Sequence, residues 1–372
     1  MSINYLIMKI IIFQPAFPKY REDFFVRIFN YYDIRFKLYF SDSSLFKFEH
    51  DVSYSSWSVV LPRVVRIPFG FFWQKGCFST SLSKGDIAVI SGNPRYLNLA
   101  FQMFYYKVKG VKIVWWGHLW SSSSSNLRLL FRSLLMVQCD ALLFYTDKEM
   151  SDYSSRVSSY LRKPLLFALN NGINVTSIVT YRSPYFSSAR EKSLLFIGRL
   201  TVKAHLELAL HAISQLDTFT RPSLHVIGDG IQKEYLVNLS LSLGISNVVT
   251  WHGSLSDESL IANIANRCMA FVYPGEVGLS LIHGMAYGLP AIVHSNRWKH
   301  MPEIAAFTAG ETGVDFEPGN AISLANEIDF LLRSPELLNN YSARATELAD
   351  NVYNTDRMAQ RFISMIEDLK PQ

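Results

Sequence analysis

Residues 271–293, FVYPGEVGLSLIHGMAYGLPAIV, contain two apolar strand patterns separated by a short helix pattern of small and apolar residues. The first strand pattern ends before Gly275, the helix pattern opens at Gly278, and it stops before Pro290. Two parallel strands need a crossover connection between them, and a helix is the usual one. The segment therefore predicts an α/β fold with a parallel sheet, in which the helix begins above the carboxyl end of a strand.

The beginning of this helix predicts a binding site for an anion such as a diphosphate. The first N–H groups of a helix have no partner within the helix, and the positive end of the helix dipole lies there. Gly278 allows a ligand to approach the backbone closely, Leu279 opens the helix, and Ser280 adds a hydroxyl donor. We expect these three residues to bind the anion.

The rest of the chain repeats the alternation of short apolar strands with helical patterns, which indicates parallel sheets with crossover helices. The rhythm breaks between Asn170 and Lys192, where Ser, Thr, Pro and charged residues show no clear period and indicate a linker. The strand candidates are residues 9–14, 34–40, 86–91, 111–116, 141–145, 193–197, 223–227, 248–251, 269–273 and 290–294.

This organisation predicts two α/β domains of similar type and a C-terminal helix. The predicted segments are a first domain at 1–172, a linker at 173–190, a second domain at 191–355 and a helix at 356–372, with residues 1–7 as a dispensable extension. The helix carries its apolar residues on one face, which must dock elsewhere on the chain, and the first domain is one such place. The residues of that face are Met358, Phe362, Ile366 and Leu369.

Composition limits the classes of protein to which the chain can belong. Its 372 residues are 49% hydrophobic, which suits two ordinary α/β domains. A net charge of +5 is too small to argue for nucleic acid, but it is compatible with an anionic ligand or an anionic membrane surface. Cys77, Cys139 and Cys268 are far apart, so neither a disulfide framework nor a zinc site is indicated, and a reducing cytoplasm fits best.

Two further strand ends carry residues suited to an anion. In FIGRLTVK, Gly198 ends a strand and Arg199 and Lys203 follow; in VIGDG, Asp229 and Gly230 form a tight turn. Open α/β sheets bind ligands at the carboxyl ends of their strands, and arginine can hold phosphate oxygens in a bidentate manner. Taken singly, these residues also fit two solvated bases in a loop and a simple Asp-Gly turn.

Five segments in this order resemble the nucleotide-sugar lobe of GT-B glycosyltransferases, specifically glycosyltransferase family 4, also called glycosyl transferases group 1. They are FIGRL, VIGDG, WHGSLSDESL, YPGEVGLSLIHGMAYGLPAIV, and MPEI followed by TGVDF. The resemblance covers residues 190–370, and its P-G-x-V-G-L-S-x-x-H pattern is similar to that of a polysaccharide-building branch. The first domain fits more loosely, through QPAFPKYREDFF, WWGHLW and LNNGINV.

The resemblance implies a GT-B fold, in which two Rossmann-like lobes with parallel sheets face a central cleft. It also implies a nucleoside-diphosphate sugar as donor, transfer with retained anomeric configuration, and neither a cofactor nor a metal ion. The chain has no D-x-D pair of the kind that holds a divalent ion in the other main glycosyltransferase fold. The residues implied in donor binding are Gly198, Arg199, Lys203, Asp229, Gly230, Glu276, Gly278, Leu279, Ser280 and His283.

This chain departs from the family pattern at three positions. The family's lysine position is Ala204 here, and Lys203 lies one residue earlier. The family's two acidic positions are Gly275 and His283, with Glu276 next to the first. A histidine can hydrogen-bond a ribose hydroxyl, so His283→Glu is expected to retain more activity than His283→Ala; the alternative is a structural helix histidine, for which glutamate would be the worse replacement.

The first domain is expected to bind the acceptor. His118 follows the apolar strand pattern VKIVWW, where it could contact the acceptor hydroxyl or the donor phosphate; alternatively it is a structural histidine. Tyr20 and Arg21 follow the first strand, and Arg21 could bind an anionic acceptor; alternatively they form a solvated loop. The expected catalytic residues are His118, Arg199 and His283.

The function implied is a retaining hexosyltransferase that acts on a glycan or lipid-linked acceptor in the biosynthesis of capsule, lipopolysaccharide O-antigen or exopolysaccharide. Two other classes stay open, a catalytically silent nucleotide-sugar-binding module and a nucleotide-sugar epimerase. We expect a cytoplasmic protein that associates peripherally with the inner face of a cell membrane and does not bind nucleic acid.

Overall fold

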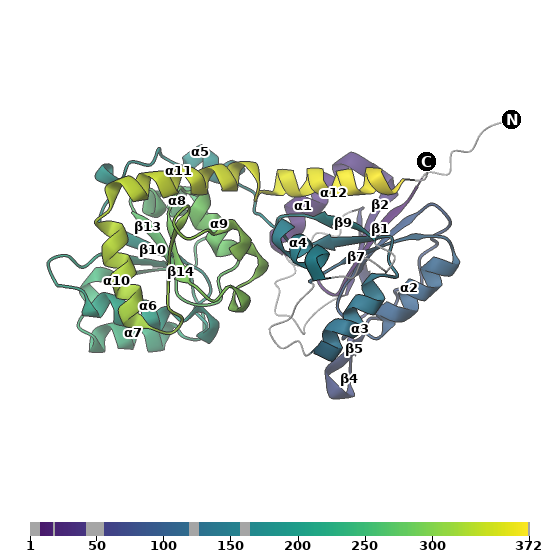
Figure 1. The fold of residues 1–372 in the computed structure, drawn as a ribbon, viewed down its shortest axis with the longest axis horizontal. Helices are drawn as coiled ribbons and strands as arrows, with labels where there is room; N and C mark the ends of the chain where they lie inside the picture. Colours follow the sequence, from purple (N-terminus) through teal and green to yellow (C-terminus); the bar gives the residue numbers. More distant parts are fainter. Residues whose placement is uncertain (1–7, 18, 42–55, 119–125, 157–163, 371–372) are drawn as a thin grey trace. The chain divides into compact units, whose positions relative to one another are not determined.

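The structure, a computed structural model, describes residues 8–17, 19–41, 56–118, 126–156 and 164–370. It divides into two compact units, which are coloured along the chain in Figure 1. The first unit comprises residues 1–170 together with 355–372, and the second comprises residues 171–354. The proposed extension at residues 1–7 lies outside the described residues.

The first unit is built on a parallel sheet that contains seven strands within the described residues. Its strands are apolar on both faces because helices cover both sides, as in the strand IIIFQ, which is buried throughout. The order is β3-β2-β1-β6-β7-β8-β9. The bounds are β1 Ile10–Gln14, β2 Phe36–Ser41, β3 Ser58–Leu61, β6 Ile87–Ser91, β7 Lys112–Trp116, β8 Ala141–Phe144 and β9 Leu165–Ala168.

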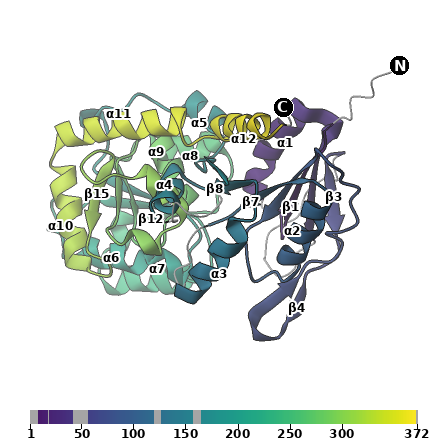
Figure 2. The same cartoon turned by 45° about the vertical axis from the view of Figure 1, so that its right-hand side comes forward.

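Helices α1 (Glu22–Tyr32) and α12 (Thr355–Leu369) pack on one face of this sheet, over side chains such as Ile10 and Ile12. Helices α2 (Asn98–Val108), α3 (Asn126–Met136) and α4 (Asp147–Arg156) pack on the other face, over Ile11 and Phe13. Figure 2 shows α2 and α3 together on their side of the strands. An antiparallel hairpin, β4 (Val65–Ile67) and β5 (Phe71–Trp73), stands apart from the sheet.

Helix α12 is the most C-terminal element, and its predicted apolar face lies in the core of the first unit. Met358, Phe362, Ile366 and Leu369 are all buried there. The ring of Phe362 meets that of Phe24 edge to face at 5.8 Å between centroids. Burial of this face explains why a segment so far along the chain belongs to the first unit.

The second unit is built on a parallel sheet with six strands among the described residues, in the order β12-β11-β10-β13-β14-β15. The strands are β10 Ser193–Ile197, β11 Ser223–Ile227, β12 Val249–Gly253, β13 Ala270–Tyr273, β14 Ala291–His294 and β15 Gly313–Phe316. The main helices are α6 Leu206–Gln215, α7 Lys233–Ser242, α8 Glu258–Ala265, α9 Leu279–Ala286, α10 Ala321–Leu332 and α11 Pro335–Asn351. One apolar core joins them.

The predicted fold class, α/β with parallel sheets, is confirmed, and each of the ten predicted strands is present. The unpredicted strands β3, β4, β5, β9 and β15 have three or four residues each, and none is buried throughout, so they lack the continuous apolar run that marks the equally short β8, β13 and β14. Within the residues predicted as a linker, α5 (Thr176–Tyr181) packs in the second unit, where Ile178 is buried and Arg182 pairs with Asp350 at 2.8 Å. A single buried residue on so short a helix leaves little pattern in the sequence.

No helix in the described part of the chain has the length and apolar character needed to cross a membrane. Cys77, Cys139 and Cys268 are buried free thiols. They belong to the apolar cores of the two units.

Candidate functional site

The loops that follow β10 and β11 run side by side in the second unit. The Gly198 N–H donates to the Ile227 carbonyl at 3.0 Å, and the Leu200 N–H donates to the Asp229 carbonyl at 2.9 Å. These bonds extend the pairing of β10 with β11 beyond the strand ends. Gly198, Arg199 and the Asp229-Gly230 turn therefore lie on one surface, as predicted from their positions at strand ends.

Glycines in these loops allow backbones to approach too closely for a side chain. A Cβ at Gly228, where φ is +147°, would lie 1.9 Å from the Gly198 carbonyl oxygen. A Cβ at Gly230, where φ is +157°, would lie 2.3 Å from the Leu200 carbonyl oxygen. Glycine is required at both positions for space and for conformation, so the loop surface has a fixed shape.

Arg199 is exposed on this loop surface, and no side chain in the described part of the chain forms a hydrogen bond or ion pair with it. It lies close to Tyr273, the last residue of β13. Burial raises the pKa of the Tyr273 hydroxyl, and the positive charge of Arg199 opposes that shift. The sequence did not single out Tyr273, although its place at a strand end is the same signal that identified Gly198.

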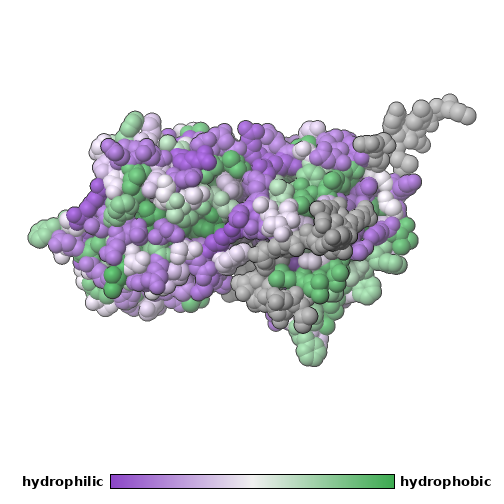
Figure 3. Space-filling model, in the orientation of Figure 1, coloured by the Kyte–Doolittle hydropathy of each residue, from purple (hydrophilic) through white to green (hydrophobic). Residues whose placement is uncertain are grey.

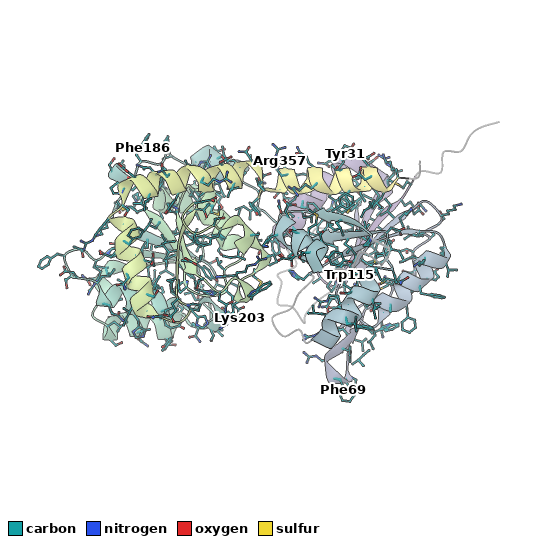
Figure 4. All side chains as sticks on the ribbon, in the orientation of Figure 1. Tyr31, Phe69, Trp115, Phe186, Lys203 and Arg357 are labelled. Atoms are coloured by element: carbon teal, nitrogen blue, oxygen red, sulfur yellow. The ribbon has the colours of Figure 1, made fainter. Side chains whose placement is uncertain are left out.

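Lys203 and Glu276, the two residues displaced by one position from the family pattern, contact each other. Lys203 Nζ lies 2.6 Å from Glu276 Oε2, and the Glu276 N–H donates to the Lys203 carbonyl at 2.9 Å. The lysine side chain is still 71% exposed. Figure 4 labels Lys203 on its loop in the second unit.

Gly275, the family's first acidic position, has no room for a side chain. A Cβ there would lie 2.0 Å from the Lys203 carbonyl oxygen. An aspartate or glutamate at position 275 would therefore clash with the Lys203 backbone unless the loop changed its conformation. Glu276 carries the carboxylate one residue later, and Lys203 compensates its charge.

Gly278 is the N-cap of α9, and Leu279 and Ser280 form its first turn. The loop before the helix is fixed by the Val277 N–H, which donates to His300 Nδ1 at 3.2 Å, and by the Val277 carbonyl, which accepts from the Met301 N–H at 2.9 Å. Helix α9 therefore starts from a rigid loop, with the first N–H groups at its predicted anion-binding end.

A buried carboxylate that the sequence did not single out, Glu303, lies beside this helix start. Its Oε2 is 3.6 Å from the position that a Cβ on Gly278 would take. Glu303 Oε1 accepts a hydrogen bond from Asn171 Nδ2 at 3.0 Å, and both residues are buried. The only sequence signal was the MPEI motif, which gives no direction for the side chain.

Asp229 and its neighbours form a local ion pair. Asp229 Oδ2 lies 2.9 Å from Lys233 Nζ, and Oδ1 accepts from the Gly230 N–H at 2.7 Å. The hydrogen bond from Lys233 and that from the Gly230 backbone lower the pKa of Asp229. This carboxylate stands at the predicted strand end, and it has an intramolecular partner.

His283 lies in α9 and bonds to the neighbouring helix α8. Its Nε2 is 3.0 Å from Glu258 Oε1, and its ring stacks on Tyr287 at 5.8 Å between centroids. The Tyr287 hydroxyl donates to Glu258 as well. Burial acts to raise the pKa of Glu258, but the hydrogen bonds from His283 and Tyr287 outweigh it and lower the pKa. A structural partner for His283 is therefore present, and the sequence did not reveal it.

A second group of predicted residues gathers at the carboxyl ends of β7 and β8 in the first unit. The Arg21 guanidinium is buried over the rings of Trp116 and Tyr145, at 4.9 Å and 5.3 Å from their centroids. The His118 ring lies 4.2 Å from the Tyr145 ring. Tyr20 is 52% exposed beside them. The sequence identified three of these residues, but it gave no sign of the central role of Tyr145.

His118 has a carboxylate partner. Its Nδ1 lies 2.9 Å from Glu149 Oε1, and Arg132 donates to the His118 carbonyl at 3.2 Å. Glu149 Oε2 also accepts from the Tyr145 N–H. This pairing orients the imidazole and leaves Nε2 as its second polar atom. Among the described residues, no cluster of three or more His, Cys, Asp or Glu side chains could hold a metal ion.

Comparison with known proteins matches the second unit to a family. Residues 180–348 fit the family model described as Glycosyl transferases group 1. The second unit is thus similar to the domains of group 1 glycosyltransferases. N-acetyl-alpha-D-glucosaminyl L-malate synthase of Bacillus anthracis is 23% identical over 188 residues, which cover 50% of this chain and 48% of the relative. The chain thus spans about half the length of this curated relative.

Solved structures show that the chain has a GT-B fold. Anabaena HepE, solved in complex with UDP, matches with a TM-score of 0.70 and 15% identity over 97% of this chain and 100% of its own. The lipopolysaccharide outer core galactosyltransferase WaaB matches with a TM-score of 0.66 and 16% identity over 96% of this chain and 100% of its own. The predicted GT-B class is confirmed.

Proposed function

We propose that the chain is a retaining, metal-independent glycosyltransferase that moves a sugar from a nucleoside-diphosphate sugar to a glycan or lipid-linked acceptor. The observation that supports this most strongly is the convergence of three glycine-containing strand-end loops within residues 180–348. They bring Arg199, Lys203 and the surroundings of the α9 N-terminus to the carboxyl edge of one sheet. The complex of HepE with UDP favours UDP as the first nucleotide to test.

The leaving diphosphate is the group that this loop surface suits. Negative charge develops on the diphosphate as the bond between the sugar C1 and the phosphate oxygen breaks. Arg199, Lys203 and the N–H groups of Leu279 and Ser280 would stabilise that charge, which is the kind of preorganised electrostatic stabilisation that metal ions supply elsewhere. Lys203 would then be shared between Glu276 and the diphosphate.

Retention follows either from two successive inversions through a covalent glycosyl-enzyme intermediate or from attack by the acceptor on the face from which the leaving group departs. Glu276 and Glu258 are paired with Lys203 and His283, so neither carboxylate is poised as a covalent nucleophile. We therefore favour a front-face mechanism, in which the leaving phosphate accepts the proton of the acceptor hydroxyl. No metal is needed if Arg199 and Lys203 carry the positive charge.

The acceptor side belongs to the first unit in this proposal. With Nδ1 directed at Glu149, His118 would use Nε2 to hydrogen-bond and orient the acceptor hydroxyl. Tyr20 is exposed and would contact the acceptor. Arg21 is buried against Tyr145, so it would act by holding that ring beneath His118 as well as by its charge.

The acceptor is proposed to be a growing cell-surface polysaccharide, and WaaB offers a structural likeness from lipopolysaccharide synthesis. A cytoplasmic enzyme at the inner face of the membrane would meet both a nucleotide sugar and a lipid-linked acceptor. Association with that membrane would be peripheral.

Donor binding and transfer separate this proposal from its alternatives. Melting temperature is measured with UDP, GDP and a panel of their sugars, since a ligand at about 100 times its Kd adds about 2.7 kcal/mol of stability. The best donor is then incubated with and without glycan and lipid-linked acceptors. Transfer with retained configuration, in the presence of a metal chelator, is the expected result. Binding without transfer would identify a binding module, and conversion of the donor alone would identify an epimerase.

A further inference from the structure

One long segment of the first unit has almost no acidic residues. Residues 52–139 contain ten Lys and Arg but a single acidic residue, Asp86. That carboxylate is buried and accepts hydrogen bonds from the Lys9 and Ser83 backbone N–H groups. The remaining residues carry 26 Lys and Arg against 30 Asp and Glu. The positive charge of the protein is therefore concentrated in this segment, which includes the β4–β5 hairpin, α2 and α3.

The same segment exposes large apolar side chains on neighbouring elements. Helix α2 exposes Phe101, Phe104 and Val108, with exposed fractions of 61%, 72% and 72%. Helix α3 exposes Phe131 and Leu134. Both helices cover the same face of the sheet, and Lys107 of α2 bonds to Gln138 just beyond α3. Their outer surfaces therefore adjoin each other.

The tip of the β4–β5 hairpin exposes one more ring, Phe69, which is 97% exposed. Its φ of +63° is in the left-handed region, where glycine or asparagine costs less. The ring has almost no contact with the rest of the protein to offset that cost. Figure 4 labels Phe69 at the far end of the hairpin, and Figure 3 shows hydrophobic residues gathered around this part of the unit.

The hairpin is held firmly at its base. The Phe72 N–H donates to the Arg95 carbonyl at 2.8 Å, and the Trp73 ring lies 6.0 Å from that of Phe101 on α2. Gln74, just after β5, is buried; its side-chain amide donates to the Gln14 carbonyl at 2.8 Å, and its backbone N–H donates to Asn98 Oδ1 at 2.9 Å. Phe69 thus projects from a hairpin whose base is anchored beside α2.

We propose that the hairpin, α2 and α3 form a membrane-docking face, which binds the anionic surface of a phospholipid bilayer. Aromatic rings would enter the interface between headgroups and acyl chains, and the surrounding Lys and Arg would contact anionic headgroups. Exposed bases on this face include Arg66, Lys107 and Lys109. A second copy of the face is a poor partner, because two surfaces of like charge would be brought together.

The docking face deepens the proposed location at the membrane, but it rests on the first unit alone. It requires neither the donor nor sugar transfer. Vesicle binding measured without any sugar nucleotide can therefore fail while transfer to a soluble acceptor succeeds, and the reverse can also occur.

The full chain is sedimented with vesicles of phosphatidylcholine alone and of phosphatidylcholine mixed with phosphatidylglycerol, at low and high salt. We expect binding to the mixed vesicles that weakens as salt is raised. Phe69→Ser combined with Phe104→Ser should lower the vesicle partition coefficient by about tenfold or more for each ring. Arg66→Glu should lower it by about fivefold or more.

Two variants in the second unit serve as matched controls. Phe219 is also 97% exposed, so Phe219→Ser removes an equivalent ring from another surface. Arg333→Glu changes the net charge as much as Arg66→Glu does. Both controls should bind vesicles as the unaltered protein does. Absence of binding to mixed vesicles, equal binding to neutral vesicles, or equal losses in the controls would overturn the proposal. A loss of self-association, seen by light scattering in the Phe69 and Phe104 variant, would instead assign the face to a protein contact.

Discussion

The two units share a parallel sheet with residues of interest at its carboxyl edge, but they build that edge in different ways. In the second unit the edge is made of backbone, with Gly228 and Gly230 packed against the carbonyls of Gly198 and Leu200. In the first unit it is made of side chains, with Arg21 and His118 arranged around Tyr145. Backbone loops suit a group that all donors share, the diphosphate, whereas side chains can change with the acceptor.

The largest effect should come from filling the tightest backbone contact of the second unit. Gly228→Ala would place a methyl group 1.9 Å from the Gly198 carbonyl oxygen at a φ of +147°. We expect a loss of about 3 kcal/mol or more of unfolding free energy and no measurable donor binding. Calorimetry and nucleotide binding measure the two effects.

Gly244→Ala is the control for Gly228→Ala. Gly244 also has a positive φ, +67°, but a Cβ there meets nothing within 4 Å. This variant should lose only about 1–2 kcal/mol, which is the cost of the left-handed conformation, and should bind the donor normally. Equal losses in the two variants would show that conformation, and not the contact between the loops, decides stability.

Removing a charge from the backbone edge should affect the donor without affecting the fold. Arg199→Ala should lower donor affinity or kcat/KM about ten- to a hundredfold, because a charge-assisted contact is worth roughly 1.5–3 kcal/mol. Its melting temperature should not change, since the side chain is exposed. Arg333→Ala, another exposed arginine of the second unit, should leave kinetics unchanged. If the kinetics of Arg199→Ala are unaltered, the diphosphate does not bind at this loop.

The corresponding test in the first unit should separate acceptor from donor. His118→Ala should lower kcat about tenfold, as the loss of an orienting hydrogen bond would, while donor affinity stays the same. Glu149→Gln keeps the shape of the His118 partner but removes its charge, and a smaller decrease is expected. A change in donor affinity in either variant would mean that His118 contacts the donor phosphate instead.

The backbone edge was largely predictable from sequence, and the side-chain edge was not. Glycines at strand ends mark close approaches, so Gly198 and Gly230 were identified from their positions, and Gly278 was identified from its place at the start of a helix. The roles of Tyr145 and Glu149 depend on which strand ends and helices meet in space, and short-range patterns carry no such information. The packing of α12 in the first unit was suggested only by its need to bury an apolar face.

His283 shows the same limit within the second unit. The sequence led us to expect that glutamate would serve better than alanine there. The structure places Glu258 3.0 Å from His283 Nε2, so His283→Glu would bring two carboxylates together in a partly buried site. We now expect the Glu variant to melt below the Ala variant, which loses roughly 1–3 kcal/mol. If Glu instead binds the donor better than Ala does at equal stability, the ligand role is restored.

At neutral pH the smallest effect should come from His294, the last residue of β14 and a buried part of the same backbone edge. Its ring stacks on that of His300 at 3.8 Å between centroids, and its Nδ1 has no hydrogen-bond partner among the described residues. Burial, together with His300 and Lys299, lowers the pKa of His294 to about 4. The folded protein therefore resists a proton that the unfolded chain accepts below its ordinary pKa of about 6.5.

The sign of the pH effect follows from this difference. Stability of the second unit should fall as pH is lowered from about 6.5 to about 4, with a contribution from His294 of at most about 1.4 kcal/mol per pH unit. His294→Phe keeps an aromatic ring against His300 but removes the proton site, so its unfolding free energy should fall less steeply over this range. Urea unfolding of both proteins at several pH values measures the difference. Parallel curves would place the proton uptake on other residues, such as His225 or His300, whose pKa values are also lowered by burial. A flatter curve for the variant would show that the backbone edge, too, depends on one side chain that must remain neutral.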